Sequence, residues 1–139
     1  MAVFTKRLEF TTKGEDDVVD ITERVQQAVK ESRYVDGVAT VFVPGSTAAV
    51  TTMEYEPGLT EDVPKMLERV SPRDTLYAHE KKWHDGNGRS HVKASLVGPS
   101  LSVPFVGGRL TLGTWQQIVF LELDIRPRKR EVVVQMIGD

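Results

Sequence analysis

The stretch "SLSVPFVGGRLTLGTWQQIVFLELD", Ser100 to Asp124, is rich in β-branched and aromatic residues and is interrupted by glycine and proline. Such runs predict β-strands, and Gly107 with Gly108 predicts a tight hairpin turn because glycine adopts positive φ angles without steric cost. The runs "HVKASLVG" before this stretch and "KREVVVQMIG" after it are β-rich as well. We therefore predict that nearly all of the C-terminal half is sheet.

The N-terminal half contains three further predicted strands. Val3 to Thr12 combines β-branched and aromatic residues and predicts the opening strand. "GVATVFVP", Gly37 to Pro44, is a short β-branched run closed by proline, which indicates a buried strand. "GSTAAVTTMEYE" then places a small-residue turn before a β-rich segment that ends near Glu54 and Glu56.

Two helices are predicted among these strands. Asp20 stands at an N-cap position with Glu23 three residues on, and the apolar spacing that follows predicts a helix to about Ser32. A second helix is predicted over Thr60 to Val70, with Pro64 tolerated in its first turn. Two helices among about seven strands predict an α+β domain with a mixed or antiparallel sheet.

The composition predicts a single globular domain over residues 1–139, because 40% of the residues are hydrophobic and 27% are charged. The net charge of −2 argues against nucleic acid or an anionic membrane as a partner. The absence of cysteine excludes disulfides, thiolate metal sites and cysteine nucleophiles. Because we find neither a secretion signal nor a long apolar run, we expect a cytoplasmic protein whose full chain is the mature form.

All three histidines lie in "HEKKWHDGNGRSHVKAS", from His79 to Ser95. Neutral imidazoles bind zinc and related metals, and near pH 7 histidine exchanges protons. We expect His91 at the start of a strand, with the "HDGNG" turn bringing His79 or His84 back towards it. The spacings of five, seven and twelve residues do not match the helical pair of a metalloprotease, so a reactive site and an ordinary polar loop both stay open.

Two short segments offer further polar groups. "PGSTAAV" presents Ser46 and Thr47 at a strand end, where hydroxyls and backbone amides can hold a phosphate. On composition alone, a turn whose hydroxyls satisfy their own backbone is the favoured interpretation. Glu54 and Glu56 are two residues apart, so on a strand they would face the same side. There they would pair with a basic residue, bind a metal, act as acid and base, or be solvated.

Aromatic and basic residues close the set of candidates. Trp115, followed by Gln116, can stack on a flat ring, with core packing as the alternative. "RPRKR", Arg126 to Arg130, is a basic cluster in a predicted hairpin turn, where charge is usually solvated. Because no aromatic residues alternate with these charges, we do not predict binding of single-stranded nucleic acid.

The segments "VFVPGSTAAVTTMEYEPGLTED", "HDGNGRSHVKASLVGPSLSVPF", "GGRLTLGTWQQIVFLELD" and "RKREVVVQMIGD" resemble the YjbQ family, whose members are described as secondary thiamine-phosphate synthase enzymes. The resemblance runs in order from Gly37 to Asp139. It implies an α+β, YjbQ-like fold, a β-rich mixed-sheet sandwich with two or three helices. It also implies a homotrimer with sites near the subunit boundaries.

Carried onto this sequence, the family pattern has two departures. Many members have histidine where Gly45 and Arg89 stand here, which lowers the expectation of a bound metal, although His84 can serve as a ligand. The guanidinium of Arg89 is instead suited to a phosphate. The positions that match the polar pattern are Glu54, His79, Asn87, His91, Trp115 and Gln116.

The function that this resemblance implies is that of a thiamine-phosphate synthase, a transferase that joins a pyrimidine diphosphate to a thiazole phosphate and releases pyrophosphate. Glu54 with His79 or His91 would bind a divalent ion or move a proton, and magnesium would suit Glu54 better than the histidines because it prefers oxygen ligands. One alternative is a metal-dependent hydrolase or lyase that holds zinc through His79, His84 and His91. Another is a trimer that binds a small phosphorylated metabolite without turning it over. The predicted catalytic residues are Glu54, His79, Asn87 and His91, and the predicted phosphate or substrate ligands are Ser46, Thr47, Arg89, Lys93, Trp115 and Gln116.

Overall fold

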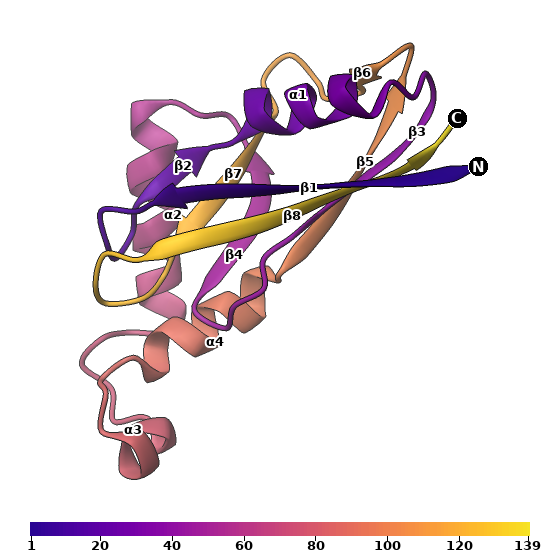
Figure 1. Cartoon of the computed structure of the whole chain (residues 1–139). Coiled ribbons are helices and arrows are strands. Elements are labelled where there is room, and N and C mark those ends of the chain that lie inside the picture. Colours follow the sequence, from indigo (N-terminus) through magenta and orange to yellow (C-terminus); the bar gives the residue numbers. More distant parts are fainter.

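The computed structural model describes all 139 residues and contains eight strands and four helices (Figure 1). The strands are β1 (Ala2–Thr11), β2 (Val18–Asp20), β3 (Gly37–Phe42), β4 (Ala48–Met53), β5 (Ser100–Val106), β6 (Arg109–Leu110), β7 (Gln117–Glu122) and β8 (Lys129–Gly138). The helices are α1 (Thr22–Ser32), α2 (Pro57–Val70), α3 (Ala78–Trp83) and α4 (Gly88–Val97). None of them is both long and apolar enough to cross a lipid bilayer.

The strands form two sheets, one in the order β1-β8-β3-β5-β6 and one in the order β2-β7-β4. The presence of helices among these strands confirms the predicted α+β class. Every strand pair is antiparallel, so both sheets are antiparallel and neither is mixed. The long strands β1 and β8 lie side by side along their whole length (Figure 1), from the pair Ala2 and Gly138 to the pair Thr11 and Lys129. The hairpin predicted at Gly107 joins β5 to β6, and Gly107 has a φ of 59°.

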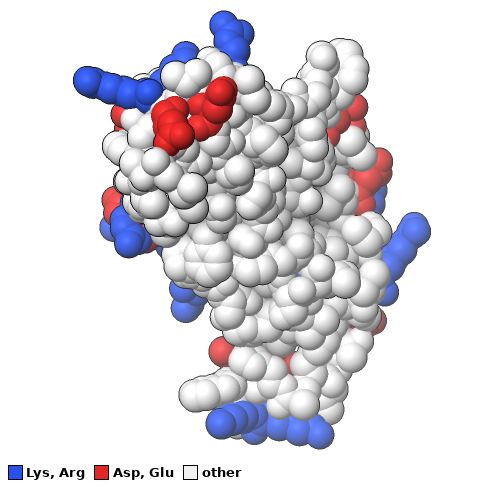
Figure 2. All heavy atoms as spheres, turned by 90° about the vertical axis from the view of Figure 1, so that its right-hand side faces the viewer, with Lys and Arg blue, Asp and Glu red and all other residues white.

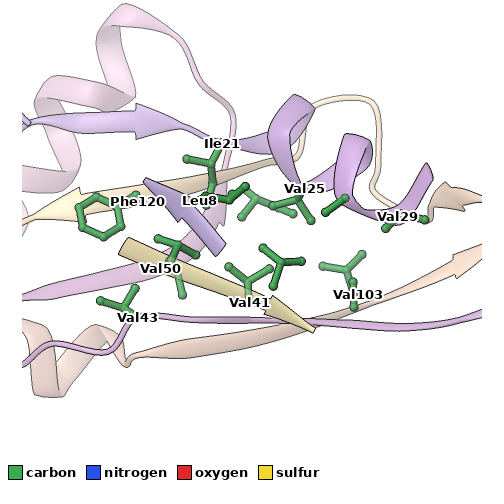
Figure 3. Close-up of a cluster of buried hydrophobic side chains, with 14 of the residues drawn as sticks. Leu8, Ile21, Val25, Val29, Val41, Val43, Val50, Val103 and Phe120 are labelled. Carbon is green, nitrogen blue, oxygen red and sulfur yellow. The ribbon is translucent and has the colours of Figure 1, made fainter. Parts of the chain in front are cut away.

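The larger hydrophobic core lies between the two sheets and under α1. Figure 3 shows Val25 and Val29 of α1 near Val41 and Val103 of the five-stranded sheet. β-Branched side chains dominate this cluster because they pack well on a pleated surface. The 17 buried members are Leu8, Ile21, Val25, Ala28, Val29, Ala39, Val41, Val43, Ala48, Val50, Val103, Phe105, Ile118, Phe120, Val132, Val134 and Met136.

Strand β7 is buried on both faces. Ile118 and Phe120 enter the larger cluster, while Val119 and Leu121 enter a second cluster with Leu67 of α2 and residues of α4 and β4. Alternate side chains of a strand point to opposite faces, so a strand covered on both sides has an uninterrupted apolar run. This explains the continuous apolar run "IVFL", Ile118 to Leu121, within the predicted strands of the stretch Ser100 to Asp124.

The strand predicted over His91 to Gly98 is wrong, because this segment is helix α4. Its buried residues Ser90, Lys93 and Ala94 follow the three-to-four residue spacing of one helix face, which the β-branched content of the segment conceals. Gly98 ends the helix with a φ of 103°. The chain reversal before it also contains α3, so the structure has four helices where two or three were expected.

The first helix has a different cap from the one predicted. Asp20 is the last residue of β2, and the N-cap position is taken by Ile21. The Asp20 carboxylate still accepts hydrogen bonds at the helix start, from the backbone nitrogen of Thr22 at 2.9 Å and its hydroxyl at 2.6 Å. The helix ends at Ser32 as predicted.

The second helix begins three residues earlier than predicted, at Pro57. Glu56 is its N-cap and accepts hydrogen bonds from the backbone nitrogens of Gly58 and Leu59, at 2.8 and 2.6 Å. Pro64 therefore lies inside the helix and not in its first turn. Glu54 and Glu56 were expected to lie on the same face of a strand. This expectation is wrong, because β4 ends at Met53 and neither residue belongs to it.

The basic segment after β7 is not a hairpin turn. Strand β7 belongs to the three-stranded sheet and β8 to the five-stranded sheet, so the chain crosses from one sheet to the other between Leu123 and Arg128. Arg128 at the end of this crossing and Arg130 at the start of β8 lie against buried carboxylates instead of being solvated. The crossing therefore places charged groups at the edge of the core.

Candidate functional site

A hollow of about 580 Å³ opens where β7 ends and β4 begins. It is lined by the turn Gly45–Thr47, by Asn87 and His91 at the start of α4, and by Asp124 with the segment Arg128–Glu131. We call it the His91 hollow. The two predicted hydroxyl residues, Ser46 and Thr47, are therefore brought together with Asn87 and His91.

The floor of the His91 hollow is a buried carboxylate, Asp124. It accepts hydrogen bonds from Nη1 of Arg128 at 2.6 Å, the backbone nitrogen of Ile125 at 2.8 Å and the hydroxyl of Thr47 at 3.1 Å. Burial raises the pKa of Asp124, but these hydrogen bonds together with the Arg128 charge outweigh it and leave the pKa below its ordinary value. Asp124 is thus an ionised acceptor at neutral pH and is not a proton donor.

A second buried carboxylate, Glu122, lies next to this floor and is fully inaccessible to solvent. Arg130 grips it in a bidentate contact, with Nε donating to Oε1 at 2.8 Å and Nη2 donating to Oε2. The same Nη2 donates to the hydroxyl of Thr47 at 2.9 Å. The Arg130–Glu122 pair thereby links β8, β7 and the turn before β4.

His79 and His91 converge at the side of the hollow. Their ring centroids lie 4.4 Å apart and the ring planes are inclined by 45°. Nε2 of His79 is also 3.2 Å from Oδ1 of Asp85, which can orient the ring. His84 takes no part, because it caps the C-terminus of α3 in an exposed, left-handed conformation with a φ of 56°.

The side-chain amide of Asn87 can contact His79 in two orientations, which differ in whether the amide accepts from Nε2 or donates to it. With Nε2 of His79 protonated, Oδ1 of Asn87 accepts from it at 3.1 Å and Nδ2 points to Asp124 at a long 3.5 Å. With Nε2 unprotonated, turning the amide lets it donate to that nitrogen at 3.1 Å and to Asp85 at 2.9 Å. We favour the second arrangement for neutral His79, because the first sets the amide oxygen against the Asp85 carboxylate.

The residues of one chain do not complete a metal site. No three or more of its His, Asp and Glu side chains are grouped so that they could hold an ion. His79 and His91 offer two imidazoles, whereas zinc takes at least three protein ligands even in catalytic sites. Within a single chain the pair of imidazoles is thus at least one ligand short of a zinc site.

Two predicted phosphate ligands lie on the opposite side of α4 from His91. Nε and Nη2 of Arg89 donate to Glu15 at 2.8 and 3.0 Å. Lys93 is buried and donates to Glu68 at 3.0 Å. Residues two positions apart on a helix point about 200° apart, so His91 and Lys93 cannot face the same hollow.

Glu54 and Trp115 line a different hollow of about 420 Å³, which we call the Trp115 hollow. It lies at the far end of the β4–β7 pair, whose register runs from Ala48 opposite Glu122 to Met53 opposite Gln117. Five residue steps along a strand separate the two ends by about 17 Å. Glu54 therefore does not meet the histidines within one chain.

The two neighbouring residues Trp115 and Gln116 point to different places. Trp115 is 73% exposed, which excludes the core-packing alternative. Gln116 folds back on the structure, accepting from the backbone nitrogen of Gly113 and donating to the hydroxyl of Thr52, each at 3.1 Å. It lines a third hollow, between β4 and β5, and not the Trp115 hollow.

The sequence reasoning missed three residues of the His91 hollow: Asp124, Arg128 and Arg130. The signal was present in "FLELD", where Glu122 and Asp124 interrupt an apolar run at positions that a buried strand would enclose. A buried carboxylate requires a charged or hydrogen-bonding partner. The nearby "RPRKR" supplies that partner, so the two segments should have been considered together.

Comparisons with known proteins agree on one family. A model of the YjbQ family, described as UPF0047 protein YjbQ-like, matches residues 6–139. A UPF0047 protein of Archaeoglobus fulgidus is 41% identical over 130 residues, covering 94% of this chain and 98% of that protein. The UPF0047 protein YugU of Bacillus subtilis is 36% identical over 135 residues, covering 96% of this chain and 98% of that protein.

Solved structures share the fold. A crystal structure from Sulfolobus solfataricus, described as a YbjQ-like protein of unknown function, matches with a TM-score of 0.93 and 31% identity over 99% of both chains. A hypothetical protein from Aeropyrum pernix matches with a TM-score of 0.85 and 35% identity, covering 96% of this chain and 99% of that one. The predicted fold resemblance is therefore confirmed.

Proposed function

The chain belongs to the YjbQ family of UPF0047 proteins, and from that premise we propose that it is a small cytoplasmic enzyme acting on a phosphorylated metabolite. The substrate would bind in the His91 hollow, with a phosphate on the basic segment and its reacting part near His91. The observation that carries this proposal is the convergence of the Gly45–Thr47 turn, His91 and Arg128–Glu131 around one hollow.

Donors for a phosphate are available at this hollow. The hydrogen bonds of Arg130 use Nε and Nη2, and its Nη1 lies beside Gly45, 3.2 Å from the position that a Cβ would take there. Lys129, between the two paired arginines, also lines the hollow. Guanidinium and ammonium groups with unused donors suit phosphate oxygens, and the Ser46 hydroxyl adds one more donor.

His91 is the proposed acid or base because it is the imidazole that lines the hollow. An imidazole changes protonation near neutral pH and can give or take a proton from a bound substrate. His79 is proposed as a positioning residue, since its ring packs against His91 and its Nε2 lies between Asp85 and Asn87. The Asn87 amide can follow the proton on His79 by turning.

The specific reaction proposed within this class is thiamine-phosphate synthesis, which the family resemblance supports. In this reaction the thiazole nitrogen forms a bond to the pyrimidine methylene carbon, the bond from that carbon to the diphosphate oxygen breaks, and pyrophosphate leaves. The basic segment at the His91 hollow would stabilise the departing diphosphate. The reaction needs no net oxidant or reductant.

We also propose that the chain assembles as a homotrimer, in which a second copy supplies Glu54 and Trp115 to the site. Residues 94–121 contain only one charged residue, Arg109, and the hollow between β4 and β5 is lined by no charged residue. Figure 2 shows a broad face free of Lys, Arg, Asp and Glu, with charges gathered around its rim. Depletion of charge is typical of the core of a protein interface. Sedimentation equilibrium should give three times the mass of 15.5 kDa.

The direct test is product formation by purified protein from the pyrimidine diphosphate and the thiazole phosphate. Replacing His91 by Gln should lower kcat by about 10²- to 10⁴-fold, the usual contribution of general acid–base catalysis. Ser95→Ala, on an exposed position of α4, serves as the folded control and should leave kcat unchanged. Wild-type protein that yields no more product than His91→Gln would contradict the proposed reaction.

The same samples distinguish binding without catalysis. If inorganic pyrophosphate raises the melting temperature of the wild type but not of Lys129→Ala, and no product forms, the protein is a binder of phosphorylated metabolites. The metal-dependent alternative is favoured by the His79–His91 contact alone and requires ligands from outside the chain. Stoichiometric metal that is lost in His91→Ala, in protein purified without a histidine tag or chelator, would replace the phosphate proposal with it.

A further inference from the structure

Helix α3 is attached to the rest of the protein by polar contacts. It lies apart from both sheets, near the start of α4 (Figure 1), and none of its side chains is buried. The only side chains of α3 that form hydrogen bonds or ion pairs outside the helix are those of His79 and Glu80. The position of His79 beside His91 therefore depends on these contacts and not on the hydrophobic core.

Glu80 joins α3 to the backbone of α4. Its Oε1 accepts a hydrogen bond from the backbone nitrogen of Gly88, the first residue of α4, at 2.5 Å. Backbone nitrogens in the first turn of a helix have no acceptor within the helix, and the helix dipole also favours a carboxylate there. A Cβ added at Gly88 would lie only 2.7 Å from the same Oε1. Glycine at this position thus makes room for the Glu80 carboxylate.

The contact with Glu80 leaves the side chain of Asn87 available to His79. Asn87 holds the N-cap position of α4, where an asparagine side chain commonly accepts from the first backbone nitrogens of the helix. Here the Asn87 side chain makes no such bond, and it contacts Nε2 of His79 at 3.1 Å instead. Glu80 therefore caps α4 in place of Asn87, and both contacts hold α3 against the first turn of α4.

We propose that Glu80 is a positioning residue for His91. By capping α4 it docks α3, so that the His79 ring stays against His91 and the Asn87 amide stays on His79. This role rests on the proposed function of His91 as the acid or base. Glu80 does not line the His91 hollow, so its loss should disturb the histidines and not the binding of a phosphate to the basic segment.

The activity test compares two substitutions of Glu80. Glu80→Ala removes the acceptor without lowering helix propensity, and it should lower kcat for thiamine-phosphate synthesis by about 10- to 100-fold, the range expected for one lost charge-assisted hydrogen bond. KM for the pyrimidine diphosphate should stay nearly unchanged. Glu80→Gln keeps an oxygen that can accept from Gly88 and should recover most of kcat. Lys81→Ala, at an exposed neighbouring position of α3, is the matched control and should have the kcat of the wild type.

A measurement on the histidine rings separates the role of Glu80 from the proposed reaction. The ring centroids of His79 and His91 lie 4.4 Å apart, so a nuclear Overhauser effect between their ring protons is expected in deuterated protein with protonated histidine. The chain has only three histidines, which keeps the spectrum simple. The effect should be lost in Glu80→Ala and kept in Glu80→Gln and Lys81→Ala.

The outcomes are distinguishable. If the wild type makes no product, the proposed reaction is refuted, and the Overhauser effect alone decides whether Glu80 positions His79. The role of Glu80 is overturned if Glu80→Ala keeps the effect, if Glu80→Gln loses it as Glu80→Ala does, or if kcat falls while the rings stay in contact. Should Glu80→Ala unfold, as judged by amide exchange in β7, Glu80→Asp takes its place, because its shorter side chain also withdraws the acceptor from Gly88.

Discussion

Replacing Arg130 by Met should destabilise the protein more than any other single loss of charge near the site. The substitution leaves Glu122, which is fully buried, without its only cationic partner. Removing one member of a buried ion pair costs about 3–5 kcal/mol, because the other charge remains buried and uncompensated. The size of this effect follows from burial and not from the length of the contact.

The expected shift in melting temperature can be worked out. At about 2.1 cal/mol/K per residue, the 139 residues give an unfolding entropy of about 0.3 kcal/mol/K. A loss of 3–5 kcal/mol then lowers the melting temperature by about 10–17 °C. Urea unfolding at pH 7 measures the same loss as a fall in the free energy of unfolding.

Two controls test the reasoning. Arg7 contacts Glu131 at 2.6 Å, but the Arg7 side chain is 61% exposed, so Arg7→Met should cost less than about 1 kcal/mol. The double variant Arg130→Met with Glu122→Leu removes both charges and should recover most of the loss. If Arg130→Met costs no more than Arg7→Met, or if the double variant is no more stable than Arg130→Met alone, the argument from burial is wrong.

Three other predictions follow from the loops and helices around the site. Burial raises the pKa of Asp16, so the folded state favours the protonated carboxyl, and the stability that the protonated form contributes is lost as the pH rises above about 4. Asp16→Asn should therefore be more stable than wild type at pH 7 but not at pH 3. Urea unfolding midpoints at the two pH values measure the difference. The hydrogen bonds from Arg89 lower the pKa of Glu15, so the Arg89–Glu15 pair stabilises the fold at pH values above the ordinary carboxyl pKa, and this stabilisation is lost as the pH falls. Arg89→Ala should therefore lower the free energy of unfolding by about 1–2 kcal/mol at pH 7 and by much less at pH 3. A Cβ at Gly88 would lie 2.6 Å from Cβ of Tyr77, so Gly88→Ala should displace α3 and speed amide hydrogen exchange there without changing it in β7.

Strand patterning was sufficient for most of the fold. β-Branched residues occur at alternate or consecutive positions in the segments that form β1, β3, β5, β7 and β8. These residues favour a strand in each segment, so the strands could be predicted without knowledge of the tertiary packing. The segment from His91 to Val97 was wrongly predicted as a strand, because its apolar residues Val92 and Leu96 do not mark a buried face. They lie four residues apart on the exposed outer face of α4. Local composition alone does not distinguish such a helix from a strand.

That one misassigned segment also changes the expected site. On a strand, His91 and Lys93 would share a face because side chains repeat every two residues, whereas on a helix they diverge. The convergence of His79 with His91 survives the change, because it depends on the chain reversal at Gly86 and not on the type of the following element. The distance from Glu54 to the histidines could not be predicted, because it depends on which ends of β4 and β7 meet.

Strand β7 has a consequence for how the protein can be altered. Its two ends border the His91 hollow and the Trp115 hollow, and both of its faces are buried. The length of β7 therefore fixes the distance between the two hollows. Inserting one residue into β7 would turn half of its side chains to the opposite face, with both ends disturbed at once. The segments that flank it, Thr111–Gln116 and Ile125–Arg128, are exposed or half-buried. A change at one hollow can therefore be made in its own flanking segment while the other hollow keeps its geometry.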